Sequence, residues 1–447
     1  MRRKAYRKLL SVACAGMLLF GCGNTKSPET VTPENEEQQA ETGSDTEDEK
    51  NFDEKSVFYR KTGDTIEKYS VCSGTVKQEE LSDAEISEQQ LDELIDGRIL
   101  VWQDSFGGSE LDLSAWECEE GYKRNEELQY YTSDGSNVSL DKGVLRITAK
   151  NEKKYEGFDW TSASIKTSGK KQFLKGRLEA KVRFTNTTGQ LGMFWTVGAW
   201  AGVNWPVCGE VNIGEQTGDS AGDYYKLTST IHYAGPDGTH QYEAGEAHSY
   251  NNQLSDQDYH ILAAEWTDDK IAIYVDDDNY VTYNIRDPYY YRPVEKSGAQ
   301  INPFLLPHYL QLSLAVQPVE NISQSDPMVM EVDWVRVYAQ EDVSDIQEMV
   351  PGKLGIDFLH NVADAAKISR SDMEYVGRVN DKVYLGAVYL PDTVVDRSCT
   401  FAVDNTELAQ ITQSGVLTVR GEGRVVVTAT DKTTGITASR AINLRIH

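Results

Sequence analysis

Apolar and polar side chains alternate along many short segments of this chain. The alternation is clear in residues 143–149 (Gly-Val-Leu-Arg-Ile-Thr-Ala) and 176–182 (Gly-Arg-Leu-Glu-Ala-Lys-Val), and residues 259–266 and 271–276 are expected to form a meander. Because successive side chains of a strand point to opposite faces, a period of two predicts β-strands with one buried face. Helical spacing is scarce, and glycine and asparagine separate the segments. The pattern therefore predicts an all-β protein built as a sandwich or a barrel.

Residues 210–215 (Glu-Val-Asn-Ile-Gly-Glu) form the most informative of these predicted strands. A regular strand presents Glu210 and Asn212 on one face, whereas Glu215 has the wrong parity to join them. A one-residue bulge would restore the parity, and Gly214 is the residue best suited to a bulge. Two carboxyls at short range on a rigid strand are what glycoside hydrolysis needs, because one attacks the sugar and the other transfers protons. The alternative is an amphipathic strand with solvated acids.

The stretch from Trp205 to Glu215 resembles the catalytic strand of glycoside hydrolase family 16, the laminarinase–lichenase family. The family pattern is Glu-x-Asp-x-(x)-Glu, and the extra residue marks the bulged branch that contains the laminarinases. The resemblance implies that Glu210 is the nucleophile and that Glu215 is the acid/base. One departure concerns Asn212, which stands where the family has an aspartate.

Motifs on both sides of this strand match the same family in the same order, over about residues 97–340. They lie at residues 100–106, 125–131, 162–167, 176–182, 192–195 and 327–338. A second departure is Ser164, which stands where many members have an arginine. The resemblance implies a concanavalin-like β-jelly-roll sandwich, in which two curved antiparallel sheets carry a substrate groove on the concave face.

The resemblance also implies that aromatic side chains line the groove. Trp195, Trp200 and Trp205 are the candidates, because an indole offers the C–H face of a sugar a flat apolar platform. Trp195 could equally belong to the core. Asn125 lies in the matching loop motif, and His232 is expected to hydrogen-bond the substrate near the acid/base, although an ordinary strand histidine is the alternative.

The predicted chemistry requires no cofactor. Seven histidines are scattered singly and no Cys-x-x-Cys occurs, so the sequence gives no zinc site. Some members of the family bind a structural Ca²⁺ through the aspartate that corresponds to Asp333, and hard oxygen ligands suit that ion. Cys208 is expected to be buried and unpaired.

The N-terminal residues 1–21 are expected to be a signal peptide, with basic residues before a short apolar core. They end before Cys22 in Leu-Phe-Gly-Cys, which resembles a bacterial lipobox and implies that Cys22 is lipidated. An ordinary secretory signal with an incidental cysteine is the alternative. Residues 22–50 are acidic and poor in large apolar residues, so they are predicted to be a disordered tether. Residues 51–96 are an extension of unknown role, with a strand expected at 57–59 and a helix at 81–95.

The C-terminal part is expected to contain a linker over residues 341–372 and a second β-domain over residues 373–447. The second segment resembles the bacterial Ig-like repeat of group 2, so a spacer or a weak glycan-binding module is expected.

The formal net charge is −27, and the basic residues form no stripe. Nucleic acid is therefore not an expected partner. The sequence predicts an exported, lipid-anchored and monomeric retaining endo-β-glucanase that cuts β-1,3- or mixed-linked β-1,3-1,4-glucan. Because Asn212 and Ser164 depart from the family pattern, a glycan-binding protein that has lost most of its catalytic activity is an alternative interpretation. A hydrolase of agar or carrageenan is a third interpretation, because it would share the bulged strand.

Overall fold

The computed structural model describes residues 100–199, 203–218, 226–245, 258–286, 300–322, 328–339, 352–359, 372–390 and 394–447, and the short strands outside these ranges that are named below. The predicted lipidation site Cys22, the tether and Trp200 lie outside the described residues. No helix in the described part of the chain is long and apolar enough to cross a membrane.

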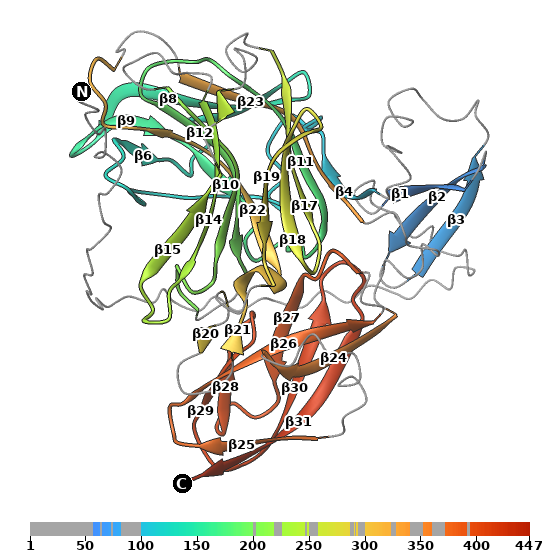
Figure 1. Ribbon diagram of the computed structural model, residues 1–447. Coiled ribbons are helices and arrows are strands. Elements are labelled where there is room, and N and C mark those ends of the chain that lie inside the picture. Colours follow the sequence, from blue (N-terminus) through green and yellow to red (C-terminus); the bar gives the residue numbers. More distant parts are fainter. Residues whose placement is uncertain are drawn as a thin grey trace, which may run out of the picture. The chain divides into compact units, whose positions relative to one another are not determined.

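Two large sheets, antiparallel except for the parallel pair of β6 and β9, face each other in the central part of the chain (Figure 1). The first contains, in spatial order, β15 (His240–Ala244), β14 (Lys226–Ala234), β13 (Glu210–Thr217), β12 (Gln190–Gly198), β22 (His308–Val316), β10 (Ser164–Lys166) and β5 (Glu117–Cys118), with β16 (His248–Ser249) paired to β14. The second contains β19 (Asp278–Asn284), β18 (Lys270–Val275), β17 (His260–Trp266), β11 (Gly176–Phe184), β23 (Met328–Tyr338), β8 (Val144–Tyr155), β9 (Phe158–Ser162) and β6 (Gln129–Tyr131). In addition, β4 (Leu100–Asp104) pairs with β23, and β7 (Val138–Asp141) pairs with β8.

One apolar core fills the space between these sheets. Phe194, Val211 and Ile213 enter it from the first sheet, and Leu178 and Leu262 enter it from the second. The alternation in the sequence explains this arrangement, since every second side chain of a strand points to the same face. The predicted all-β jelly-roll sandwich is confirmed.

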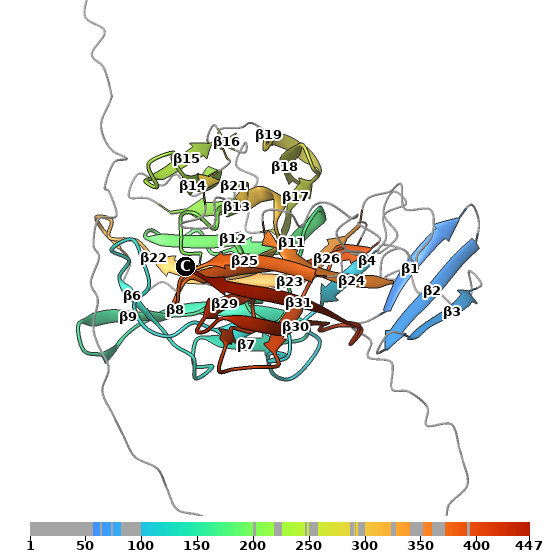
Figure 2. The ribbon, with the colours of Figure 1, turned by 90° about the horizontal axis from the view of Figure 1, so that it is seen from below.

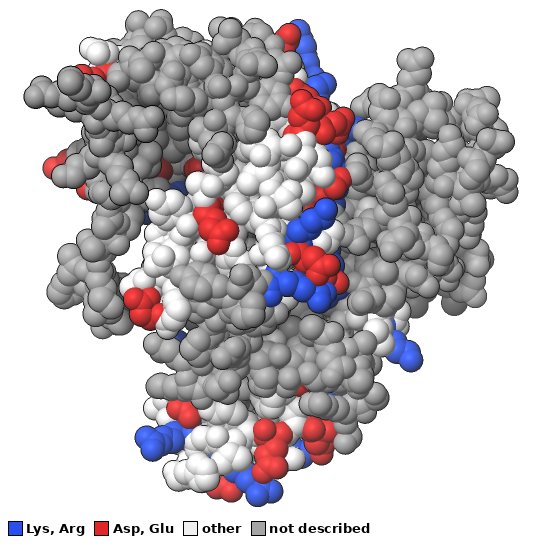
Figure 3. Space-filling view, in the orientation of Figure 1, with Lys and Arg blue, Asp and Glu red and all other residues white. Residues whose placement is uncertain are grey.

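The outer face of the second sheet carries a group of ion pairs around the buried side chain of Arg177. Arg177 pairs with Glu179, with Glu265 at 3.1 Å and with Asp277 at 3.1 Å. Figure 3 shows acidic and basic side chains lying next to one another on the face that it presents. The charges of the described residues on that face are therefore interspersed.

The N-terminal extension contains a three-stranded antiparallel sheet of β1 (Val57–Thr62), β2 (Thr65–Cys72) and β3 (Thr75–Leu81). The sequence analysis expected only the first of these strands. The expected helix begins at the last residue of β3, and the rest of it lies outside the described residues.

Two further four-stranded sheets form at the C-terminal end (Figure 2). One contains β24 (Lys353–Phe358), β26 (Lys382–Leu390), β29 (Val416–Val419) and β28 (Ala409–Ile411), and the other contains β25 (Asp372–Gly377), β31 (Thr437–Ile446), β30 (Gly423–Asp431) and β27 (Cys399–Val403). They enclose their own apolar core, which includes Ile356, Leu385 and Val427. Part of the expected linker is therefore the strand β24, because Ile356 is needed in that core.

Candidate active site

The strand β13 contains the predicted bulge. Asn212 pairs with Thr230 of β14, and Glu215 pairs with Thr228, so three steps along β13 match two steps along β14. On the other side, β12 residues Trp195 and Phe194 pair with Asn212 and Gly214, and Ile213 has no counterpart in that ladder. The bulge brings Glu215 to the face that carries Glu210 and Asn212, as the sequence predicts.

Gly214 makes this bulge sterically feasible. Ile213 lies in the core between the sheets, and a Cβ atom placed on Gly214 would point into the same core, 2.7 Å from Leu262 Cδ1. Two successive residues thus face inward, and only one of them can carry a side chain. The reason for glycine here is the close approach of the second sheet.

Glu210 is held by the tryptophan that precedes the strand. Trp205 Nε1 donates a hydrogen bond of 2.8 Å to Glu210 Oε2, and His232 Nε2 lies 3.8 Å from Glu210 Oε1. Burial and the nearby charge of Glu215 raise the pKa of Glu210 to about 7. The hydrogen bonds from Trp205 and Asn212, together with the charge of Arg124, act in the opposite direction.

Glu215 lies in a similar environment but has different neighbours. Burial raises the pKa of Glu215 to about 7, and the negative charge of Glu127 raises it further. Hydrogen bonds from Asn212 and Thr228 oppose this shift. The pKa values of both acids are thus shifted upward to about 7, and Arg124 is a cation that opposes the shift at Glu210.

Asn212 is buried and hydrogen-bonds both carboxyls through its side chain. Its Nδ2 lies 3.3 Å from His232 Nε2. With the ring proton on Nδ1, His232 Nε2 can accept a hydrogen bond from this amide, and the role of each ring nitrogen depends on the tautomer. His232 Nδ1 can then donate to His240 Nε2, 2.8 Å away. Burial, together with the neighbouring His240, lowers the pKa of His232 to about 4, so this ring is neutral at physiological pH.

Comparison with known proteins decides the family. The model of the glycosyl hydrolases family 16 matches residues 125–335. The chain is 31% identical to a beta-glucanase of Rhodothermus marinus over 256 residues, which cover 54% of this chain and 84% of that protein. The chain belongs to glycosyl hydrolase family 16.

Other proteins similar to this family 16 domain differ from one another in length and in the activity that their names give. A glucan endo-1,3-beta-glucosidase A1 of Niallia circulans is 30% identical over 277 residues, which cover 56% of this chain and 39% of that protein. A keratan-sulfate endo-1,4-beta-galactosidase of Sphingobacterium multivorum is 28% identical over 251 residues, which cover 54% of each chain. This chain therefore spans well under two thirds of the length of both.

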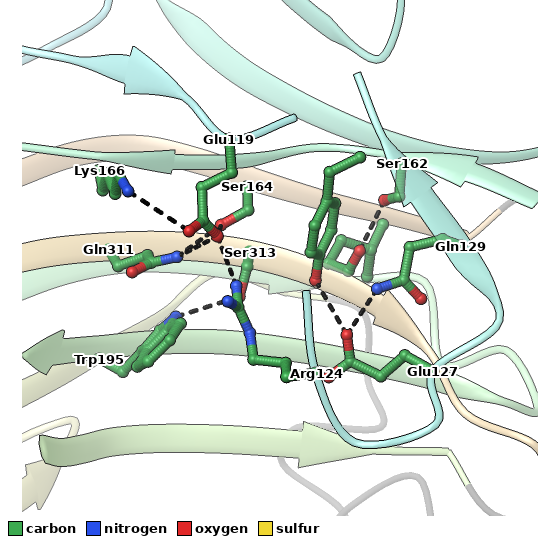
Figure 4. Close-up of polar contacts among 12 residues, drawn as sticks. Glu119, Arg124, Glu127, Gln129, Ser162, Ser164, Lys166, Trp195, Gln311 and Ser313 are labelled. Atoms are coloured by element: carbon green, nitrogen blue, oxygen red, sulfur yellow. Dashed lines mark hydrogen bonds and ion pairs between the residues drawn. The ribbon is translucent and has the colours of Figure 1, made fainter. Parts of the chain in front are cut away.

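On the same sheet as the bulged strand, toward β22 and β10, Glu119 organises a polar network (Figure 4). Glu119 pairs with Arg124 at 2.5 Å and with Lys166 at 3.4 Å, and it accepts hydrogen bonds from Ser164 Oγ at 2.8 Å and Gln311 Nε2 at 2.7 Å. Ser164, the position where an arginine is usual in the family, is thus a hydrogen-bond donor to Glu119. The positive charge beside it comes from Arg124, a residue that the sequence analysis missed.

Trp195 lies on the cleft face, between Asn212 of β13 and Gln311 of β22. Its Nε1 donates to Ser313 Oγ at 3.1 Å, and the Arg124 guanidinium lies 5.0 Å above its ring. The side chain is only 5% exposed. Trp195 therefore offers no open face for a sugar in this conformation, which supports the core-like alternative.

Arg124 is presented by the loop that contains the Asn125 motif. Asn125 and Glu126 adopt left-handed backbone conformations, with φ of 60° and 55°. Asn125 is exposed, and Glu127 turns inward to accept a 2.6 Å hydrogen bond from Gln129 Nε2. The loop thus directs Arg124 and Glu127 toward the catalytic strand and leaves Asn125 at the surface.

Two further residues from the sequence analysis, Cys208 and Asp333, have other surroundings. Cys208 is buried and free, as predicted, and burial followed by the charge of Glu210 raises the pKa of its thiol to about 12. Asp333 forms an ion pair of 2.8 Å with Lys181. Among the described residues, no group of three or more His, Cys, Asp or Glu side chains could hold a metal ion. Binding of Ca²⁺ at Asp333 stays a prediction, because backbone and amide carbonyls can also hold this ion.

Two further residues that the sequence analysis did not select lie beside His232. His240 Nε2 hydrogen-bonds His232 Nδ1, and Tyr242 pairs with His232 across the sheet. A signal was available, because Gly-Pro-Asp-Gly at residues 235–238 predicts a tight turn and hence a hairpin partner for the His232 strand.

Proposed function

We propose that this family 16 chain is a retaining endo-β-glucanase that hydrolyses β-1,3- or mixed-linked β-1,3-1,4-glucan. The observation that carries the proposal is the bulge of β13, which gives Glu210 and Glu215 a common face and a common amide partner in Asn212. Relatives named as a glucan endo-1,3-beta-glucosidase and a beta-glucanase support the substrate class.

The different surroundings of the two acids suggest their roles. Glu210 receives the Trp205 N–H and the field of Arg124, and both favour its ionised form, so in this proposal Glu210 attacks the anomeric carbon. Glu215 holds the proton and gives it to the glycosidic oxygen as that bond breaks, and one half of the chain leaves. Glu215 then takes a proton from water, whose oxygen displaces Glu210 and restores the original anomeric configuration.

Asn212 positions both carboxyls in this proposal. Its side chain hydrogen-bonds Glu210 and Glu215 and stands where an acidic residue is usual in the family. Positioning is thus retained, while one negative charge is absent from the group.

The direct test uses the folded, soluble form without the signal peptide, incubated with laminarin, lichenan and agarose. We expect new reducing ends from laminarin or lichenan, and proton NMR should find the first product with the β-configuration of the substrate. Retention also requires carboxyls separated by roughly 5–5.5 Å. Inverted first products would contradict the mechanism, and cleavage of agarose alone would contradict the substrate class.

A second candidate function is a glycan-binding protein with little or no catalysis. Asn212 favours it, because the usual third acid is missing from the strand. If the soluble form cleaves none of the three polysaccharides but binds laminarin in calorimetry, this candidate replaces the hydrolase. The galactosidase relative makes keratan-type chains a useful fourth substrate in the same assay.

We also propose that Cys22 carries a lipid that anchors the exported enzyme, that residues 23–50 hold it away from the membrane, and that the C-terminal sheets are an Ig-like spacer. The resemblance of residues 19–22 to a lipobox supports the anchor. Cys22→Ala should leave a precursor or release the protein from membranes during fractionation. Membrane association equal to that of the wild type would contradict the anchor.

A further inference from the structure

Four rings lie in contact beside Glu210, on the side of β13 that leads to β15. Trp205 and His240 have ring centroids 4.5 Å apart, and His232 and His240 are stacked at 5.1 Å. Tyr242 lies 5.9 Å from His240 and 6.1 Å from His232. The rings thus form a continuous aromatic group, which we call the β15 group.

Strand register fixes the β15 group on the cleft face. Glu210 pairs with His232, and His232 pairs with Tyr242, so the three side chains form one row across β13, β14 and β15. Side chains directly opposite one another in such a row share a face of the sheet. His240 lies two residues before Tyr242 on β15 and therefore points the same way. Trp205 is tied to the row by its hydrogen bond to Glu210.

The outer members of the β15 group are open to solvent. Tyr242 is 56% exposed and Trp205 is 41% exposed, and His240 is exposed as well. Exposed aromatic rings that are contiguous with a catalytic carboxylate are a typical platform for a sugar, because a pyranose places its C–H face on a ring and its hydroxyls in water. Partial burial of its ring lowers the pKa of His240, which favours the uncharged form in such a contact.

We propose that Tyr242, His240 and Trp205 form a sugar-binding subsite, which holds a pyranose unit of the glycan chain on the β15 side of Glu210. The proposal rests on the proposed function, since it assigns the surface to a substrate that continues past the catalytic pair. Tyr242 is the specificity-determining member, because it lies farthest from Glu210 along the row and only a longer chain reaches it.

The test is made in a Glu210→Gln background, so that bound glycan is not cut. Calorimetry with laminari-oligosaccharides of increasing length should find that Tyr242→Ala weakens binding roughly 2- to 12-fold for the longer chains, which corresponds to the loss of one aromatic contact. Tyr242→Phe should bind as the parent does, because stacking needs the ring and not the hydroxyl. Leu113→Ala, which changes a 67% exposed apolar residue outside the cleft, is the matched control.

A second measurement reports contact directly. Titration with the same oligosaccharides should shift the NMR signals of the His240 ring, and it should leave those of the exposed His447 unchanged. Equal affinities of the parent and Tyr242→Ala at every chain length, with unshifted His240 signals, would overturn the subsite while glucan cleavage by the wild type still stood. If the wild type cleaves no glucan, the hydrolase proposal fails, and length-dependent binding that requires Tyr242 would still support the subsite.

Discussion

On the β10 side of Glu210 and Glu215, the polar side chains already bind one another, whereas on the β15 side the aromatic rings are open to solvent. On the first side, Glu119 has four partners, and Arg124 covers Trp195. On the second side, Tyr242 is mostly exposed. One half of the cleft is therefore fixed by its own contacts, and the other half offers surface that only a ligand can cover.

This difference separates stability from binding. A charged group removed from the β10 side leaves a buried partner unpaired, so the folded state is affected first. A ring removed from the β15 side was in water already, so the folded state should change little and the affinity for glycan should change more. Substitutions on the two sides can test this division.

Loss of either catalytic carboxyl should have the largest effect. Glu215→Gln removes the acid/base and should lower kcat roughly 10²- to 10⁴-fold on laminarin. Glu210→Gln should lower kcat at least as much, because no covalent intermediate can form. Both variants should keep wild-type oligosaccharide affinity in calorimetry within a few-fold. A variant with near wild-type kcat would contradict the assignment of its residue.

Arg124→Ala should destabilise the fold by roughly 3 kcal/mol, because it leaves the buried carboxylate of Glu119 without its main partner. Lys166 still lies 3.4 Å from Glu119, which keeps the expected loss at the low end for buried pairs. The measurement is the denaturant midpoint of the variant. Arg124→Ala combined with Glu119→Gln should recover part of the loss, and the absence of any recovery would mean that the pair is not coupled.

Asn212→Asp should move the alkaline limb of the activity profile. The acid form of Glu215 is lost as the pH rises through its pKa of about 7, so activity should fall above neutral pH. A carboxylate at residue 212 adds negative charge next to Glu215, which raises that pKa and displaces the limb to higher pH. We expect a higher kcat at neutral and alkaline pH. Profiles of kcat against pH that coincide for both forms would place Asn212 outside the charge network.

Cys208→Ala should have the smallest effect. The thiol lies close enough to Glu210 for the carboxylate to influence its pKa, but with a pKa of about 12 it stays neutral across the active range. The pH profile should therefore keep its shape, and a thiol reagent should not inhibit the folded wild type. A displaced profile would show that the thiol takes part in the chemistry.

The catalytic strand could be predicted from the sequence because the residues that define its two faces and its bulge are neighbours in the chain. Parity places Glu210 and Asn212 on one face, and Gly214 marks where the extra residue fits. The same period of two predicts the two sheets. Asp333 shows the limit of this reasoning, since its partner Lys181 comes from another strand and a single aspartate does not reveal it.

The surroundings of the strand could not be predicted because they depend on loops and on pairs distant in sequence. Arg124 reaches Trp195 through a loop with two left-handed residues, and Glu126 is not a residue type that signals this conformation strongly. Tyr242 is the exception, because the Gly-Pro-Asp-Gly turn at residues 235–238 signals the hairpin of β14 and β15, whose register places Tyr242 opposite His232. Hairpin signals fix such a register more reliably than a family motif does.

The bulge also limits the ways in which the strand can misfold. If the extra residue moved beyond Glu215, the carboxyl would turn into the core beside Leu227 and Leu262, and Gly214 would face the cleft. An unpaired carboxylate in that apolar setting is strongly disfavoured. The shifted register is therefore not a stable folded state, so inactive molecules of this kind should unfold and be degraded instead of accumulating. For this strand, catalytic competence and the folded state are lost together.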